Sequence, residues 1–316
     1  MVYRITLVGL GLVGSSFGLA LKQTGAEFEI VGHDKDRSAA KRAHKNGAVD
    51  RTEWNLISAC DGADLVVLTI PISGIQSTLA AIAQDLKEGC VVTDTASLKV
   101  PVLEWARELL PGTVHFVGGH PIIGALPDFS LPLSADLLAG ATYCLTPGTD
   151  TPPQALRAVS DLVEAVGAKA FYLDAVEHDS LIAAVEHTPL LLALALQGMA
   201  RKSPSRREMI QLCGQDYDHA MQPLVGDAQG LADLCRLNAD NLVRWLDGFQ
   251  AELSRVRELV ANQDNESLRA LFGEALEIRA GWVREHLGGP GTDYQDFSAA
   301  RMMFGGAFEA RKKEGE

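Results

Sequence analysis

The chain opens on Ile5-Thr6-Leu7-Val8-Gly9-Leu10-Gly11-Leu12-Val13-Gly14, an apolar run that passes directly into glycines spaced as GxGxxG. The run has the length and β-branched content of a buried strand, and helical periodicity follows the last glycine. In this strand-to-helix context the glycines permit a tight turn, close approach of the backbone to a pyrophosphate and close packing of the helix. We therefore predict a Rossmann-type turn that binds phosphate at a helix N-terminus.

The alternation of short β-branched runs with amphipathic segments continues to about residue 174. The predicted strands cover residues 5–8, 28–32, 65–69, 91–94, 115–118, 142–145 and 170–173. The predicted helices cover residues 14–23, 36–46, 73–86, 101–110 and 152–166. Parallel strands need such crossover helices, so the fold class is α/β, with an N-terminal Rossmann-type doubly wound sheet.

After Asp174 the strand signals stop and only helical periodicity remains. From Leu242 to Val260 the apolar residues are spaced by three and four along a stripe longer than a surface helix needs, which predicts contact with a second copy of the chain. We expect a dinucleotide-binding Rossmann domain over residues 1–174 and an all-helical substrate and dimerisation domain over residues 175–287. Residues 288–316, which begin at Gly288-Gly289-Pro290-Gly291, are expected to form a loosely ordered tail.

Composition excludes several classes of partner. The length of 316 residues favours two domains over one core. A formal net charge of −13 without a basic stripe argues against binding to nucleic acid or to an anionic membrane surface. The longest strongly apolar stretch, Leu190 to Leu196, is much shorter than the roughly 20 residues of a membrane helix. Five scattered cysteines indicate a reducing compartment, and we expect a cytoplasmic protein.

The expected cofactor is NAD. The second predicted strand ends at Gly32-His33-Asp34, and a carboxylate there accepts hydrogen bonds from the adenosine ribose and repels a 2′-phosphate. Lys35 and Arg37 follow closely, so NADP stays open. The alternative is a glycine-rich turn that merely joins a strand to a helix. The residues predicted to bind the cofactor are Gly9, Gly11, Leu12, Val13, Gly14, Asp34, Thr69, Pro71 and Thr95.

Three stretches follow predicted strands, where ligands of open α/β sheets bind. They are Thr69-Ile70-Pro71-Ile72, Asp94-Thr95-Ala96-Ser97-Leu98-Lys99 and Gly118-Gly119-His120-Pro121-Ile122-Ile123-Gly124. Because the carboxyl ends of neighbouring parallel strands meet at one edge of the sheet, we expect all three stretches to face one cleft.

These stretches resemble the prephenate/arogenate dehydrogenase family, whose Rossmann domains carry a similar Asp-x-x-Ser-x-Lys segment followed by a Gly-Gly-His-Pro-x-x-Gly loop. Further along, His178-Asp179 and His187-Thr188-Pro189 resemble the family's His-Leu-Pro signature, and residues 231–238 resemble its dimer helix. The resemblance implies a homodimer that acts on a cyclohexadienyl substrate in tyrosine biosynthesis. It would convert prephenate to 4-hydroxyphenylpyruvate, or arogenate to tyrosine, by NAD-dependent oxidative decarboxylation.

The resemblance also implies residue roles. His120 would accept the hydroxyl proton, which a neutral histidine can do at physiological pH. Ser97 would hydrogen-bond that imidazole or the substrate hydroxyl, and His187 would line the substrate pocket.

Each of these residues also has a simpler interpretation from the sequence alone. Ser97 is equally typical of an N-cap, and His120 of a loop histidine. His187 stands before Thr188-Pro189, which is either a helix start or a proline in a longer helix, and it can simply pack there. The other histidines, His178 among them, show no ligand spacing, so we assign them solvated or packing roles and expect no metal.

Two departures from the family concern the substrate carboxylates. Ala125-Leu126-Pro127 stands where many members carry a Thr-Glu pair, and residues 214–223 lack the arginine that the family tends to carry ahead of its dimer helix. Arg201-Lys202 and Arg206-Arg207 are candidate replacements, or a solvated helix face. The alternatives to the family are a β-hydroxyacid-type dehydrogenase, whose catalytic lysine would be Lys202, and a catalytically silent NAD-binding dimer.

Overall fold

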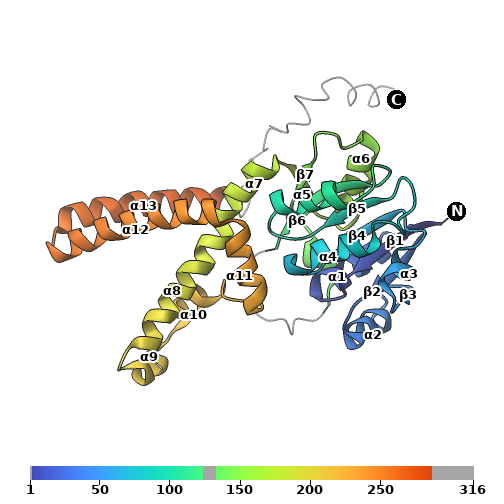
Figure 1. Cartoon of the computed structure of the whole chain (residues 1–316). Coiled ribbons are helices and arrows are strands. Elements are labelled where there is room, and N and C mark those ends of the chain that lie inside the picture. The colour runs from blue at the N-terminus through green and yellow to red at the C-terminus, as the bar shows by residue number, and fades with distance from the viewer. Residues whose placement is uncertain (1, 124–132, 287–316) are drawn as a thin grey trace, which may run out of the picture. The chain divides into compact units, whose positions relative to one another are not determined.

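The computed structural model describes residues 2–123 and 133–286, and its elements fall into two compact units that divide after Asn241. The first unit contains an eight-stranded sheet in the order β3-β2-β1-β4-β5-β6-β7-β8, and Figure 1 labels its strands β1 to β7. The strands are β1 (Tyr3–Val8), β2 (Phe28–His33), β3 (Arg51–Thr52), β4 (Leu65–Leu68), β5 (Val91–Asp94), β6 (His115–Ile122), β7 (Thr142–Pro147) and β8 (Lys169–Tyr172).

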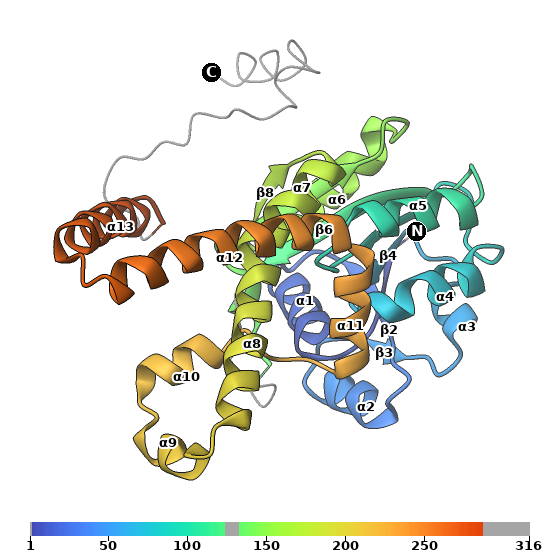
Figure 2. The ribbon, with the colours of Figure 1, turned by 60° about the vertical axis from the view of Figure 1, so that its left-hand side comes forward.

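Helices cover both faces of this sheet (Figures 1 and 2). One apolar cluster contains Phe17 of α1 and Val159 of α6, and the other contains Ile75 of α4 and Val102 of α5. The helices up to residue 165 are α1 (Leu12–Gln23), α2 (Arg37–Lys45), α3 (Leu56–Cys60), α4 (Ile72–Ile82), α5 (Val100–Leu109) and α6 (Pro153–Ala165). The predicted doubly wound Rossmann-type sheet is confirmed.

We did not predict β3 and α3 from the sequence, because both are too short to produce a periodic pattern. We also placed Gly119 and His120 in a loop, and this was wrong: β6 runs to Ile122 and pairs antiparallel with β7, against the parallel rhythm. The reason is close packing. A Cβ on Gly118 would lie 2.3 Å from Thr146 Oγ1, and one on Gly119 would lie 2.6 Å from the carbonyl oxygen of Asp94, so the strand needs glycines there.

Every element that the structure describes after Asp174 is helical, as predicted. These elements are α7 (Ala175–Ile182), a π-helical turn (Ala183–His187), α8 (Thr188–Lys202), α9 (Arg206–Leu212), α10 (Gln215–Met221), α11 (Ala228–Leu237), α12 (Ala239–Ala261) and α13 (Asn265–His286). The predicted stripe from Leu242 to Val260 lies on α12, where Trp245, Phe249 and Leu253 are exposed. The predicted tail lies outside the described residues.

The helix from Ala175 to Lys202 is continuous and, by length and composition alone, apolar enough to cross a membrane. Its apolar part is therefore longer than Leu190 to Leu196, the longest apolar stretch considered from the sequence. A core helix of a water-soluble protein passes the same test, and this helix carries the buried polar side chains of His178, Asp179 and His187.

The π-helical turn lies in the middle of that helix. Pro189 has no backbone N–H to donate to the preceding turn, and the carbonyl of Ala183 accepts both the backbone N–H of Thr188 and, at 2.7 Å, its hydroxyl. Thr188-Pro189 is therefore a proline within a longer helix, the second of the two interpretations. The turn carries Glu186 and His187, and π-helical turns of this kind occur often at functional sites.

Candidate active site

The glycine-rich turn leaves β1 at Gly9, whose φ of +98° is one that side chains rarely adopt. A Cβ on Gly14 would lie 2.0 Å from the carbonyl oxygen of Gly9, so the start of α1 can approach β1 only with glycine there. Around Gly11 nothing described lies within 4 Å of the position of a Cβ. The first turn of α1, which contains Leu12 and Val13, has no side-chain cap, so its N–H groups face this open space and fit a pyrophosphate.

The other predicted cofactor residues gather around this turn. The Asp34 carboxylate accepts the backbone N–H of Leu10 at 2.7 Å, which holds it beside the turn at the end of β2. The Thr69 hydroxyl donates to the carbonyl of Gly9 at 2.5 Å, Pro71 precedes the first residue of α4, and Thr95 directly follows β5. Their places at the carboxyl ends of adjacent strands agree with a dinucleotide site.

Arg37, one of the two cations that left NADP open, is engaged elsewhere. Its guanidinium lies 4.1 Å from the centroid of the Trp54 ring, a cation–π contact. The stacking keeps this charge on an aromatic face, which favours a ribose hydroxyl over a 2′-phosphate beside Asp34.

A fully buried ion pair underlies the catalytic edge of the sheet. The ammonium of Lys99 pairs with the Asp94 carboxylate and also donates to the carbonyl of Gly119 at 2.6 Å. The N–H of Gly119 donates to the other oxygen of Asp94 at 3.1 Å. The pair therefore fixes the backbone on both sides of Gly119, directly before His120. Lys99 is the one buried lysine or arginine in residues 2–123 and 133–281, and Asp94 already neutralises it.

A chain of polar contacts runs from His120 to the start of α5. His120 Nδ1 lies 3.1 Å from His178 Nε2, and His178 Nδ1 lies 2.8 Å from Asp179 Oδ1. The Asp179 carboxylate accepts the backbone N–H groups of Lys99 at 2.7 Å and Val100 at 2.9 Å. The three side chains of His120, His178 and Asp179, which we call the relay, are all buried.

The remaining predicted catalytic residues lie beside the relay. The hydroxyl of Ser97 is 3.3 Å from His187 Nε2, so the imidazole that it reaches is that of His187 and not that of His120; the substrate hydroxyl, the other predicted partner of Ser97, stays a prediction. His187 Nδ1 is buried and has no hydrogen-bond partner among the described residues. On the other ring nitrogen of His120, Glu186 Oε2 lies 3.6 Å from Nε2.

Burial shifts the pKa values of these groups. It lowers the pKa of His120 well below 6.5, and the neighbouring His178, Lys99 and His187 lower it further. Burial also lowers the pKa of His187 to about 4 and raises that of Glu186 to about 7. At neutral pH both histidines are therefore uncharged, the state in which an imidazole can accept a proton.

Sequence reasoning missed the part that His178 and Asp179 take in this cluster. The solvated role considered for His178 is wrong, because its side chain is fully buried and bonded at both ring nitrogens. One signal was present: two adjacent polar residues at the start of a helix whose following turns are apolar. Their contacts bridge 58 residues to His120 and 80 to Lys99, and no spacing in a single sequence encodes such contacts.

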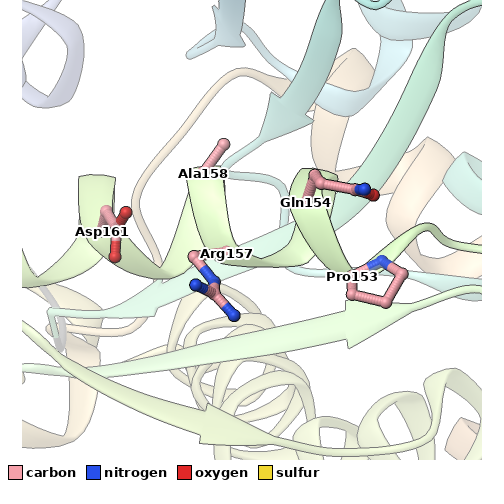
Figure 3. Close-up of a pocket in the computed structure, with 5 residues that line it drawn as sticks. All are labelled: Pro153, Gln154, Arg157, Ala158 and Asp161. Carbon is pink, nitrogen blue, oxygen red and sulfur yellow. The ribbon is translucent and has the colours of Figure 1, made fainter. Parts of the chain in front are cut away.

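Two surface cavities lie away from this cluster. One, of about 370 Å³, is lined by residues of α6 (Figure 3), and none of the predicted site residues is among them. The other, of about 400 Å³, is lined by Leu194, Gln197, Gly198, Arg201, Arg206 and Leu224. Arg201, Lys202, Arg206 and Arg207 are all exposed, which agrees with a solvated helix face.

The sequence matches the models of one protein family over most of its length. Residues 17–172 match the sequence model of the nucleotide-binding domain of prephenate dehydrogenase, and residues 174–274 match that of its dimerization domain. The chain is 31% identical over 295 residues to the prephenate dehydrogenase of Lactococcus lactis subsp. cremoris, covering 87% of this chain and 76% of the relative. It is 29% identical over 288 residues to the cyclohexadienyl dehydrogenase of Zymomonas mobilis, covering 90% and 97%.

Solved structures give the same result. Prephenate dehydrogenase from A. aeolicus, in complex with hydroxyphenyl propionate and NAD+, superposes with a TM-score of 0.81 at 25% identity, covering 89% of this chain and 98% of that one. Synechocystis arogenate dehydrogenase superposes with a TM-score of 0.72 at 26% identity, covering 89% and 100%.

Proposed function

The chain belongs to the prephenate dehydrogenase family, and on this premise we propose that its histidine cluster carries out the oxidative decarboxylation of prephenate or arogenate. The enzyme is an NAD-dependent dehydrogenase. The observation that carries the proposal for the site is the neutral, buried imidazole of His120 at the carboxyl edge of the sheet that also bears the glycine-rich turn.

We assign the base to His120. When NAD is bound, it supplies the acceptor for the hydride that leaves the ring carbinol carbon. His120 takes the hydroxyl proton, holds it while the ring loses carbon dioxide and becomes aromatic, and returns it to the phenolic oxygen. A positioned base of this kind typically contributes about 10²–10⁴ to the rate.

Ser97 and His187 are proposed to orient the substrate. The Ser97 hydroxyl and His187 Nε2 already contact one another, so a substrate oxygen near them would join an existing hydrogen bond. His187 Nδ1 is a buried nitrogen without a partner in the described residues, and such a group favours a polar ligand. The two residues come from elements 90 positions apart in the sequence.

The chain departs from the family in the groups that would bind the substrate carboxylates. Lys99 is held by Asp94, and the described residues contain no other buried lysine or arginine to pair with a carboxylate. Burying an unpaired carboxylate costs several kcal/mol, so prephenate needs a cation from outside this cluster. Arogenate carries its own ammonium, which offsets part of that cost.

We propose that the enzyme is a cytoplasmic homodimer, with the division between cofactor and substrate domains near residue 174. The match to a dimerization domain and the exposed stripe of Trp245, Phe249 and Leu253 on α12 support the dimer. Trp245→Glu should shift the mass measured by light scattering to that of a monomer. An unchanged mass would remove α12 from the interface.

The deciding experiment is an assay of the purified protein with prephenate or arogenate and with NAD or NADP, in all four combinations, followed by the absorbance of the reduced cofactor. Turnover with NAD and either acid supports the proposal and reports both preferences. If NAD binds and both acids are inert, small 3-hydroxy acids test the β-hydroxyacid alternative, although its candidate lysine, Lys202, is exposed at the end of α8. Inertness towards those acids as well leaves a silent NAD-binding dimer.

A further inference from the structure

We propose that His178 and Asp179 are positioning residues, which hold His120 in the tautomer whose Nε2 carries a lone pair. Each hydrogen bond along the relay needs one donor and one acceptor, and this requirement determines which nitrogen of His120 carries the proton. Its kinetic test rests on the function proposed above for His120, but its spectroscopic test does not.

When ionised, the Asp179 carboxylate can accept hydrogen bonds but cannot donate one. It accepts two backbone N–H groups, from Lys99 at 2.7 Å and Val100 at 2.9 Å, and these donors cannot reverse their role. They lie at the start of α5, where the helix end also favours a negative charge. The third contact, at 2.8 Å to His178 Nδ1, must therefore also be a donor to the carboxylate.

The proton on His178 Nδ1 decides the rest of the relay. In a neutral imidazole one nitrogen donates and the other accepts, so His178 Nε2 is an acceptor. The nitrogen 3.1 Å away, His120 Nδ1, must then carry its own proton to make the hydrogen bond. His120 Nε2 is left with a lone pair, which is what a general base needs.

The surroundings of His120 Nε2 agree with this assignment. The group that faces it is Glu186 Oε2 at 3.6 Å, and burial raises the pKa of that carboxyl to about 7. Below pH about 7 this carboxyl keeps its proton and can face a lone pair without repulsion. An N–H on Nε2 would instead favour an ionised carboxylate.

Neighbouring contacts hold the relay in place but do not determine which ring nitrogens of His178 and His120 carry the protons. Asn238 Nδ2 donates to the backbone carbonyl of Asp179 at 3.0 Å, and the rings of His120 and His178 meet edge to face with their centroids 5.2 Å apart. A purely structural role for His178 would need only this packing. The proposed positioning role predicts more. A substitution at Asp179 must change which nitrogen of His120 carries the proton, although the two side chains are joined only through His178.

Asp179→Asn tests that consequence. An asparagine whose NH₂ takes the place of Oδ1 points a donor at His178 Nδ1, while its oxygen takes the place of Oδ2 and still accepts the N–H of Val100; the N–H of Lys99 then loses its acceptor. His178 would have to accept there and move its proton to Nε2, and His120 would have to do the same. The substitution therefore blocks the base while conserving volume and losing one buried hydrogen bond, that of the Lys99 N–H.

The first measurement is the ¹⁵N NMR spectrum of the full-length protein with labelled histidines, of which the chain has eight. Spectra of His120→Asn and His178→Gln assign the two signals by their loss. We expect both residues protonated on Nδ1 in the native enzyme and on Nε2 in Asp179→Asn. A native His120 protonated on Nε2 overturns the proposal, whatever the variants do.

The second measurement is turnover at neutral pH. Asp179→Asn should lower kcat by about 10²–10⁴, the usual contribution of a general base, with little change in NAD affinity. His178→Gln should recover part of the activity that His178→Leu loses, because an amide can accept from His120 and donate to Asp179. Equal activity of the Gln and Leu variants would assign His178 to packing and sink the proposal.

The matched control is Asp64→Asn. The Asp64 carboxylate also accepts a backbone N–H, from Arg4 at 2.7 Å, but it lies at the opposite end of the sheet, just before β4. The Asp64→Asn variant should be less stable than the native enzyme but should keep its kcat. If the NMR result holds while prephenate and arogenate are inert, the proposed function fails and the positioning role stands.

Discussion

The glycine-rich turn and the histidine cluster lie at the same edge of the sheet, yet they are built in opposite ways. The turn consists of backbone groups within residues 9–14, and its requirement is the absence of side chains. The cluster consists of side chains from several elements, joined by contacts that bridge 58 to 90 residues. Changes in the turn should therefore alter binding of the cofactor, and changes in the cluster should alter chemistry with binding intact.

The largest expected effect belongs to the cluster. His120→Asn removes the proposed base and should lower kcat by about 10²–10⁴ or more. NAD affinity, measured by fluorescence titration, should stay within about twofold, or roughly 0.4 kcal/mol, because the ring does not belong to the turn. A parallel loss of NAD affinity would break the separation between the two regions, and full activity would remove His120 from the mechanism.

The turn supplies the reciprocal test through a pair of glycines. Gly11→Ala adds a methyl group into space where the described residues, its two chain neighbours aside, place no atom within 4 Å, so the Tm should hold while NAD affinity falls by about tenfold, or roughly 1.4 kcal/mol. The methyl group would occupy space that the pyrophosphate needs.

Gly14→Ala is the contrasting variant. Its Cβ would lie 2.0 Å from the carbonyl oxygen of Gly9, so both Tm and NAD affinity should fall. If Gly11→Ala binds NAD as tightly as the native enzyme, the open space at Gly11 is not where the pyrophosphate lies.

The same contrast explains what the sequence could predict. The strand-to-helix turn with its glycines was predicted from the sequence, because its geometry is local and only glycine satisfies it, although α1 begins at Leu12, two residues earlier than predicted. The strand that carries His120 was shortened to four residues because glycines normally weaken strands, whereas here Gly118 and Gly119 allow contact with β7 and β5. Ser97, His120 and His187 were found through family resemblance, and His178 was not, because its function depends on a neighbour that the fold brings from another element.

The smallest expected effect concerns Glu186, which faces the base. Its carboxyl has a pKa raised to about 7 by burial, so it is protonated below that pH and ionised above it. Cys144, opposite His120 on β7, stays neutral because burial raises its pKa to about 11. An ionised Glu186 at 3.6 Å stabilises the imidazolium that forms when His120 takes the substrate proton, and a protonated one does not. Because the Glu186 side chain is 45% exposed, solvent screening reduces this attraction to roughly 1 kcal/mol, about fivefold in rate.

The kcat of the native enzyme should therefore rise about fivefold as pH increases through about 7, whereas Glu186→Gln should remain near the lower level at every pH. The contribution of Glu186 to stability should change in the opposite direction. Between pH 4.5 and about 7 the folded Glu186 holds a proton that the unfolded chain has lost, so this contribution falls as pH rises through that window, whereas His120 and His187, whose pKa values are lowered, contribute with the opposite sign. Urea denaturation at several pH values should therefore show stability rising more steeply with pH through that window in Glu186→Gln than in the native enzyme. If the variant keeps the native pH profile of kcat, the rise belongs to another group, and Glu186 only lines the entrance to the base.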